Sequence, residues 1–179
     1  MKFLKDVIYL CIISLLIASC GQIYYTYKYQ PTREINVYYN RDTQLNQKII
    51  KVIQNADKFV YFGIYTFTRT DIKDALLGAK KRGLDVRGIT DRKQLTEISS
   101  QGKIIEELKN AGIPILTQDH LAIMHLKTVV TDKQYASGSF NWTSAATNLN
   151  DEVLEIGSDE SVRYQYEKIL KKIFAQYAG

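Results

Sequence analysis

Strand-like and helix-like segments alternate along most of this chain, and this alternation limits its possible folds more than any other feature. Short runs rich in apolar and β-branched residues have the composition of strands at 35–39, 59–67, 84–90, 113–116 and 152–156. Segments with apolar side chains at helical spacing occur at 43–56, 71–82, 104–111 and 160–177. Strands that alternate with helices predict an α/β fold, in which helices cover one mixed β-sheet.

The length and the composition agree with one folded domain. The chain has 179 residues, of which 45% are hydrophobic and 24% are charged. A chain of this size supports one hydrophobic core and is small for two domains, and the composition is that of a globular protein. The sequence contains no internal repeat, so each of its motifs occurs once.

A β-hairpin is predicted late in the chain, with one strand over residues 126–131 and an extended segment over 135–141. Asp132 opens the polar stretch between them, and aspartate is a favourable turn residue. We predict the register in which Thr131 pairs with Tyr135 across a loop of three residues.

In that register Lys127 lies opposite Ser139, and His125 lies opposite Asn141. Side chains alternate between the two faces of a strand, so these four side chains are expected to share one face. A slip of one residue would turn two of them away.

These residue types suit chemistry on a phosphodiester. The imidazole of His125 can attack phosphorus and divide one difficult displacement into two easier ones. Lys127 supplies a positive charge for the phosphate oxygens, and Ser139 and Asn141 can donate hydrogen bonds to them. Gly138 has no Cβ atom, which allows its backbone to approach a phosphate closely.

The order of these residues matches a known motif. The segment reads His125-Leu126-Lys127, then Asp132 after four residues, then Gly138-Ser139-Phe140-Asn141. This spacing resembles the H-x-K-x4-D motif of the phospholipase D superfamily and its G-S-x-N sequence. A single copy in a short chain is most similar to the bacterial nuclease branch of that superfamily.

The resemblance implies a phospholipase D-like α/β/α sandwich on one mixed β-sheet, over residues 34–179. It also implies that Glu152 orients the catalytic histidine by a hydrogen bond, as carboxylates do in other catalytic sites. The position of Asp132 at a turn suggests a structural role in the hairpin. The gap between Asp132 and Gly138 is one residue shorter than in many members of the superfamily.

The resemblance further implies a homodimer, because members of this branch build one active site from two protomers. The chain encodes one His-x-Lys, and a two-fold interface would bring both copies of His125 together, one as nucleophile and one as acid and base. No cofactor is implied. The sequence has no cluster of histidine, cysteine and carboxylate residues at metal-ligand spacing, so we expect activity without metal.

The N-terminus predicts a targeting segment. Lys2 and Lys5 precede an apolar run over residues 7–18, which is shorter than the roughly twenty residues that a membrane-spanning helix needs. The run ends in Ala18-Ser19-Cys20-Gly21, which resembles a bacterial lipobox with Cys20 as the lipidated residue. We expect a lipoprotein signal peptide over residues 1–19, with conventional cleavage or an uncleaved anchor as alternatives.

Residues 20–33 would then tether the catalytic domain to the extracytoplasmic side of a membrane in the cell envelope. The net charge of +5 is compatible with a polyanionic substrate or an anionic membrane surface. The leading function is a membrane-tethered, non-specific endonuclease that cleaves DNA, with RNA as an open alternative. A phospholipase D-type hydrolase of anionic lipid such as cardiolipin and an inactive nucleic-acid-binding lipoprotein are the other candidates.

Three further features have less specific interpretations. Residues 91–102 follow a strand and are polar, so we expect a loop there that forms a lip of the substrate groove. Basic residues at 80–82, Arg87 and 92–93 fit either a solvated face or a substrate groove. We expect His120 to be an exposed loop residue, and Thr143 and Ser144 to cap a short helix.

Overall fold

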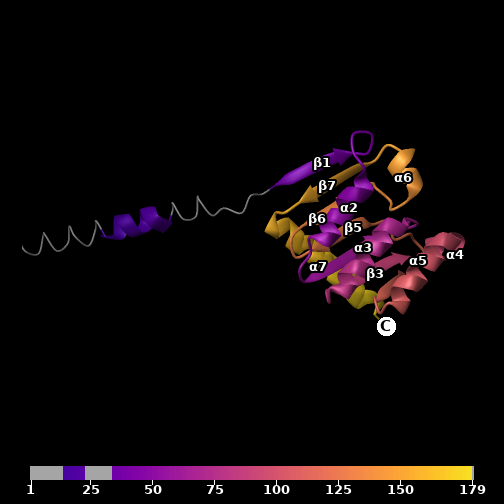
Figure 1. The fold of residues 1–179 in the computed structure, drawn as a ribbon. Helices are drawn as coiled ribbons and strands as arrows, with labels where there is room; N and C mark the ends of the chain where they lie inside the picture. The colour runs from indigo at the N-terminus through magenta and orange to yellow at the C-terminus, as the bar shows by residue number, and fades with distance from the viewer. Residues whose placement is uncertain (1–13, 23–33, 179) are drawn as a thin grey trace, which may run out of the picture. The chain divides into compact units, whose positions relative to one another are not determined.

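The computed structural model describes residues 14–22 and 34–178 (Figure 1). The chain divides into two compact units, Met1–Thr32 and Arg33–Gly179. Residues 14–22 are helical, and the side chain of Cys20 is exposed. The start of the predicted signal peptide and the predicted tether from residue 23 onward lie outside the described residues. Of the helices in the described ranges, none combines the length and the apolar character that crossing a bilayer requires.

Within residues 34–178, seven strands form one sheet in the order β1-β7-β6-β5-β2-β3-β4. The strands are β1 (Ile35–Tyr39), β2 (Phe59–Ile64), β3 (Asp85–Asp91), β4 (Ile115–Gln118), β5 (Lys127–Thr131), β6 (Tyr135–Gly138) and β7 (Val153–Gly157). The pairs β2–β3 and β3–β4 are parallel, and the other neighbours are antiparallel. The sheet is therefore mixed, with its parallel part at the β4 edge.

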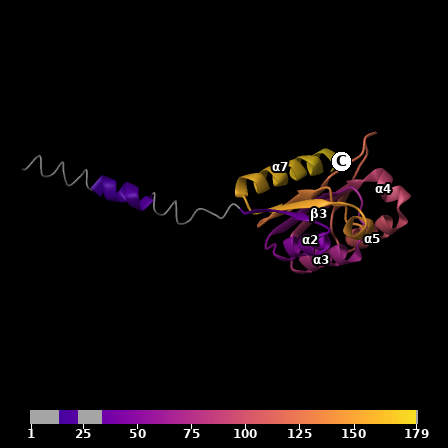
Figure 2. The same cartoon turned by 90° about the horizontal axis from the view of Figure 1, so that it is seen from above.

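Helices cover both faces of this sheet (Figure 2). The helices are α2 (Leu45–Gln54), α3 (Thr70–Lys81), α4 (Arg92–Glu97), α5 (Ser99–Asn110), α6 (Ser144–Asn148) and α7 (Glu160–Tyr177). Figure 2 shows α2 and α3 on one face and α7 on the other. The prediction of an α/β sandwich on one mixed sheet is confirmed.

The two faces of the sheet have separate apolar cores. Strand β2 is buried along almost its whole length, and its successive side chains point to opposite faces. Phe62 packs in the larger core together with α2, α3 and α5, while Tyr61 packs in the smaller core with Leu170 and Phe174 of α7. This double coverage explains why the sequence of β2 is almost continuously apolar.

The expected polar loop at residues 91–102 is wrong, because this segment forms α4 and the start of α5. The Asp91 carboxylate accepts a hydrogen bond from the backbone N–H of Gln94 and thereby caps α4. Gln101 occupies a fully buried position on α5, where it bonds to Tyr65 and Thr90. A buried glutamine makes the helix look polar in sequence although this side faces the core.

The predicted register of the β5–β6 hairpin is also wrong by one residue. Val130 pairs with Tyr135 and Thr128 with Ser137, so the same register extended places Lys127 opposite Gly138. The turn is tighter than predicted because Thr131 closes it: its backbone N–H donates to the Gln134 carbonyl at 2.8 Å.

Candidate active site

The end of β6 determines where Ser139 and Asn141 lie relative to His125 and Lys127 in the observed register. The strand stops at Gly138, and the chain bends at Ser139, whose backbone N–H still donates to the Val153 carbonyl at 3.1 Å. A Cβ atom on Gly138 would lie 2.2 Å from the backbone oxygen of Val153, so this approach to β7 requires glycine. Ser139 and Asn141 are therefore positioned by the bend and not by the alternation along a strand.

His125 and Lys127 lie where the chain enters β5. The His125 side chain is exposed, whereas Lys127 is only 7% exposed and its ammonium group donates to the backbone oxygen of His125 at 3.0 Å. Burial lowers the pKa of Lys127, and the nearby charge of Glu152 opposes that shift. A partly desolvated ammonium group beside a histidine is suited to stabilise charge on a phosphate.

Glu152 lies buried just before β7. Its carboxylate accepts hydrogen bonds from the Ser139 hydroxyl and, at 3.0 Å, from the Asn150 amide. Its backbone N–H donates to the side chain of Asn40, which fixes the position of this residue next to the end of β1. In this single chain the carboxylate holds Ser139, and the hydrogen bond to His125 that the resemblance implied is not among its contacts with described residues.

Asn141 is held by the segment that follows β2. Its side-chain oxygen accepts a hydrogen bond from the backbone N–H of Thr66 at 3.2 Å. Trp142 continues this contact, since its N–H donates to the Thr66 carbonyl at 3.0 Å. The side-chain nitrogen of Asn141 makes no hydrogen bond within the described part of the chain, so it remains able to donate to a ligand.

Asp132 lies at the other end of the hairpin, away from these residues. Its carboxylate accepts hydrogen bonds at 3.0 Å from the backbone N–H groups of Asp57 and Lys58. Burial acts to raise the pKa of this carboxyl, but the two N–H donors hold it below its usual value. Asp132 thus joins the hairpin to the loop between α2 and β2, which is a structural contact.

Tyr65 is the residue at this site that the sequence did not indicate. Its ring lies edge-on to the imidazole of His125, with the ring centroids 4.9 Å apart. The Lys127 ammonium lies 5.2 Å from the centroid of the same ring. The Tyr65 hydroxyl accepts a hydrogen bond at 3.1 Å from Gln94, and its carbonyl accepts one from Gln101. The sequence signal that could have indicated this network is the position of Gln101 on the apolar side of the amphipathic helix α5.

The segment leading to His125 is held by two buried polar side chains. The Asp91 carboxylate accepts a hydrogen bond from the N–H of Met124 at 2.9 Å. The Gln118 amide donates to the carbonyls of His120 and Ala122. Together with α4, this segment borders a small hollow of about 250 Å³ to which the exposed His120 contributes.

The structure therefore gathers four of the five predicted catalytic residues through direct contacts or charge. The Lys127 ammonium donates to the backbone oxygen of His125 and interacts with the charge of Glu152, and the Glu152 carboxylate accepts from the Ser139 hydroxyl. Asn141 reaches the same end of the sheet through Thr66, next to Tyr65.

The short helix α6 begins as expected, since the Thr143 hydroxyl accepts from the N–H of Ala146. In the described ranges, histidine, cysteine and carboxylate residues form no group of three able to hold a metal ion.

Comparison with known proteins gives a family and a fold. Residues 49–174 match the family model described as "Cardiolipin synthase, PLD-like domain". Nuc, a phospholipase D family member from Salmonella typhimurium, superposes with a TM-score of 0.75 over 80% of this chain and 95% of its own, at 27% identity. NucT from Helicobacter pylori gives a TM-score of 0.69 over 79% of this chain and 97% of its own, at 25% identity.

The curated relatives are named for reactions on phospholipids. The chain is 28% identical over 131 residues to a mitochondrial cardiolipin hydrolase of Chlamydomonas reinhardtii, covering 73% of this chain and 57% of that protein. It is 32% identical over 119 residues to a phospholipase D of Rickettsia conorii, covering 66% of this chain and 58% of that protein. The chain thus spans somewhat under three fifths of the length of each of these relatives.

Proposed function

Since this chain belongs to the family of phospholipase D-like domains, we propose that it is a metal-independent phosphodiesterase whose leading substrate is DNA. The observation that carries this proposal is that the exposed imidazole of His125 and the buried ammonium of Lys127 lie beside the same Tyr65 ring, 4.9 Å and 5.2 Å from its centroid. A nucleophile that is open to solvent and a cation fixed beside it are the two groups that displacement at a phosphodiester needs most.

In the proposed reaction a ring nitrogen of His125 attacks phosphorus, and the bond from phosphorus to the leaving oxygen breaks. Lys127 and the side-chain amide of Asn141 stabilise the negative charge that builds on the phosphate oxygens. Water then attacks the phosphohistidine, which releases a phosphate monoester and restores the imidazole. Ser139 is held by Glu152 and would donate its hydrogen bond to the phosphate on exchanging this partner.

A second acid and base group is needed to protonate the leaving oxygen, and we propose that a second copy of the chain supplies it. In a two-fold dimer the partner's His125 would fill this role. Exposed apolar side chains near the site support such an interface. Leu121 and Ile123 precede His125 in the same segment and are 103% and 50% exposed, and Leu149 after α6 is 72% exposed.

The choice of DNA as the leading substrate is supported by the likeness to Nuc and NucT, which this chain covers almost completely. The curated relatives favour the second candidate, hydrolysis of an anionic phospholipid such as cardiolipin. The same side chains serve both reactions, because they contact the phosphodiester and not its substituents.

A direct test uses the full chain in excess chelator with labelled single-stranded DNA, double-stranded DNA and cardiolipin vesicles in parallel. We expect wild type to cleave DNA and His125→Ala to lose this activity. His120→Ala is the matched control, because it removes the other histidine of the chain from an exposed loop and should retain activity. Cleavage of the vesicles alone would select the lipid reaction. DNA binding without cleavage, equal in wild type and His125→Ala, would instead select an inactive nucleic-acid-binding protein.

We also propose that Cys20 carries a lipid that tethers the domain on the extracytoplasmic side of the cell envelope. The exposed Cys20 follows small residues at the end of the apolar run. Metabolic labelling with a radioactive fatty acid tests this, because Cys20→Ser should lose the label and Cys11→Ser should keep it. Equal labelling of both variants would refute the lipid anchor.

A further inference from the structure

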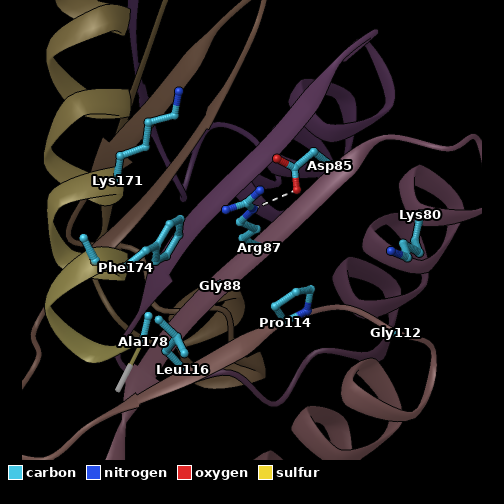
Figure 3. A pocket seen from close by; sticks show the side chains of 11 residues that line it. Lys80, Asp85, Arg87, Gly88, Gly112, Pro114, Leu116, Lys171, Phe174 and Ala178 are labelled. Atoms are coloured by element: carbon cyan, nitrogen blue, oxygen red, sulfur yellow. Dashed lines mark hydrogen bonds and ion pairs between the residues drawn. The ribbon is translucent and has the colours of Figure 1, made fainter.

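A second hollow lies away from the candidate active site, between α7, β3 and the segment that enters β4 (Figure 3). Its volume is about 410 Å³, within the range of small-molecule sites. Figure 3 shows Arg87 in the middle, Phe174 and Ala178 on the side of α7, and Pro114 opposite them. No function described above uses these residues.

The hollow is separate from the catalytic end of the sheet. Arg87 pairs with Tyr61 near the start of β2, and both side chains face α7. Lys127 pairs with Ile64 at the end of β2, on the face covered by α2 and α3. The two sites therefore lie on different faces and toward different ends of the strands.

Cations dominate the polar half of the hollow. Lys80, Arg87 and Lys171 line it, and Asp85 is the one carboxylate in its lining. The Lys171 ammonium also pairs with Glu167 of α7 at 2.7 Å. The guanidinium carbon of Arg87 and the ammonium of Lys171 lie 5.7 Å and 5.8 Å from the centroid of the Tyr61 ring, so both surround the same side chain. Basic groups from two elements, β3 and α7, thus border the same part of the hollow.

Asp85 holds Arg87 in place and leaves part of the hydrogen-bonding capacity of the Arg87 guanidinium unused. The Arg87 Nε donates to the Asp85 carboxylate at 2.8 Å, and its two terminal nitrogens make no hydrogen bond within the described residues. Tyr61 donates its hydroxyl to the other oxygen of Asp85 at 2.6 Å. Burial and this carboxylate raise the pKa of Tyr61 to about 12, so Tyr61 remains a neutral donor. The terminal nitrogens of Arg87 are therefore oriented and available for two parallel hydrogen bonds.

The other half of the hollow is apolar. Leu116 and Pro114 line it from the β4 side, and Phe174 lines it from α7. Ala175 of α7 and Ala178 directly after it also line the hollow, where larger side chains would fill the space. An occupant would therefore place an apolar group here while its charged group contacts Arg87.

We propose that this hollow binds an organic phosphate, in which a phosphate group is attached to an apolar substituent. A phosphate offers the oxygens that the Arg87 fork recognises, with Lys171 and Lys80 as additional charges. The substituent would pack on Phe174 and Leu116. Its source is either a lipid, such as a phosphatidic acid, or a nucleotide, and both present the same chemistry to the hollow.

Calorimetric titration of the full chain tests the proposal with three probes: inorganic phosphate, thymidine 5′-monophosphate and dihexanoyl phosphatidic acid below its micelle concentration. The titrations use a Lys127→Ala background, which weakens anion binding at the candidate active site. We expect at least one organic phosphate to bind more tightly than inorganic phosphate, and the tighter of the two identifies the source. Equal binding of all three probes would overturn the role of the apolar half.

Three variants assign the binding to the hollow. Arg87→Gln should weaken it about tenfold or more, because it removes a charge-assisted bidentate contact. Ala175→Leu keeps every charge and fills the space from an exposed helix position, so it should abolish binding of the organic phosphate. Lys81→Gln removes a charge next to Lys80 that does not line the hollow, and should have about twofold effect or less.

The outcome is independent of the proposed catalytic function, because binding is measured without turnover. Binding of neither organic phosphate, or binding unchanged by both Arg87→Gln and Ala175→Leu, would overturn the proposal. Circular dichroism of each variant confirms that a loss of binding does not reflect unfolding. On the wild-type background these variants should retain any phosphodiester cleavage, which separates this site from the active site.

Discussion

At the scale of the residue, the contacts of Tyr65 connect the two groups that the proposed reaction needs most. Its ring touches the imidazole of His125 and lies near the ammonium of Lys127, while Gln94 donates to its hydroxyl and Gln101 to its backbone carbonyl. We infer that Tyr65 is a positioning residue that orients the nucleophile.

The ring rather than the hydroxyl of Tyr65 should carry this effect. Tyr65→Leu should lower kcat about tenfold to a hundredfold with a smaller change in KM, because a misplaced nucleophile impairs the reaction step. Tyr65→Phe keeps the ring and should remain within about threefold of wild type. Phe59→Leu removes a ring from the start of β2, the strand that precedes Tyr65, and is the matched control. Wild-type kcat in Tyr65→Leu would refute this role.

The burial of Lys127 predicts how activity is lost at alkaline pH. The group must be protonated to stabilise a phosphate, and burial lowers its pKa below the usual value of 10.5. Activity should therefore fall with rising pH before an ordinary lysine would lose its charge. In Lys127→Arg the remaining activity should not show this limb, because arginine stays charged. A pH profile of kcat/KM for both proteins checks this, and identical limbs would assign the titration to another group.

At the scale of the element, the β5–β6 hairpin depends on Asp132. Its carboxylate accepts the N–H groups of Asp57 and Lys58, which come from another part of the chain. These contacts pull the first residue of the turn toward the α2–β2 loop, and Thr131 closes the chain behind it with side-chain bonds to the N–H groups of Lys133 and Gln134. This combination explains why the loop is one residue shorter than its sequence suggested.

Asp132→Asn should lower the free energy of unfolding at neutral pH by about 1–2 kcal/mol, since it weakens hydrogen bonds to an ionised acceptor. The folded-state pKa of Asp132 is below its usual value, so its stabilisation is present above pH 3.8 and is lost as the pH falls through the folded pKa. The difference between the two proteins should thus shrink in acid. Urea unfolding at pH 7 and pH 3 measures it, with Asp42→Asn as an exposed control. A difference that is constant with pH would refute the ionised contact.

At the scale of the whole molecule, the single His-x-Lys of each chain has a consequence for assembly. If two protomers build one site, specific activity should fall as the protein is diluted below the dissociation constant of the dimer. Sedimentation and activity measured over the same concentration range check this. Chains carrying His125→Ala, added in excess to wild type and allowed to exchange, should also suppress its activity. A monomer with full activity would refute the shared site.

Local patterns in the sequence determined the alternation of elements, the mixed sheet and the segment that carries His125, Lys127, Ser139, Asn141 and Glu152. Helical and strand periodicity depend on residues a few positions apart, so they are readable without the fold. The spacing of the motif is equally local. The terminal helix, predicted over 160–177, forms over those residues.

Tertiary structure alone decided the hairpin register, the helical form of residues 92–97 and 99–102, the partner of Glu152 and the place of Tyr65. Each depends on contacts between segments far apart in the chain: Asp132 bonds 75 residues away to Asp57, and Asn40 fixes the backbone of Glu152 at a separation of 112 residues. A sequence pattern records which side chains favour a strand or a helix. It does not record which distant hydrogen-bond donor a carboxylate will meet, because that depends on how the completed layers pack.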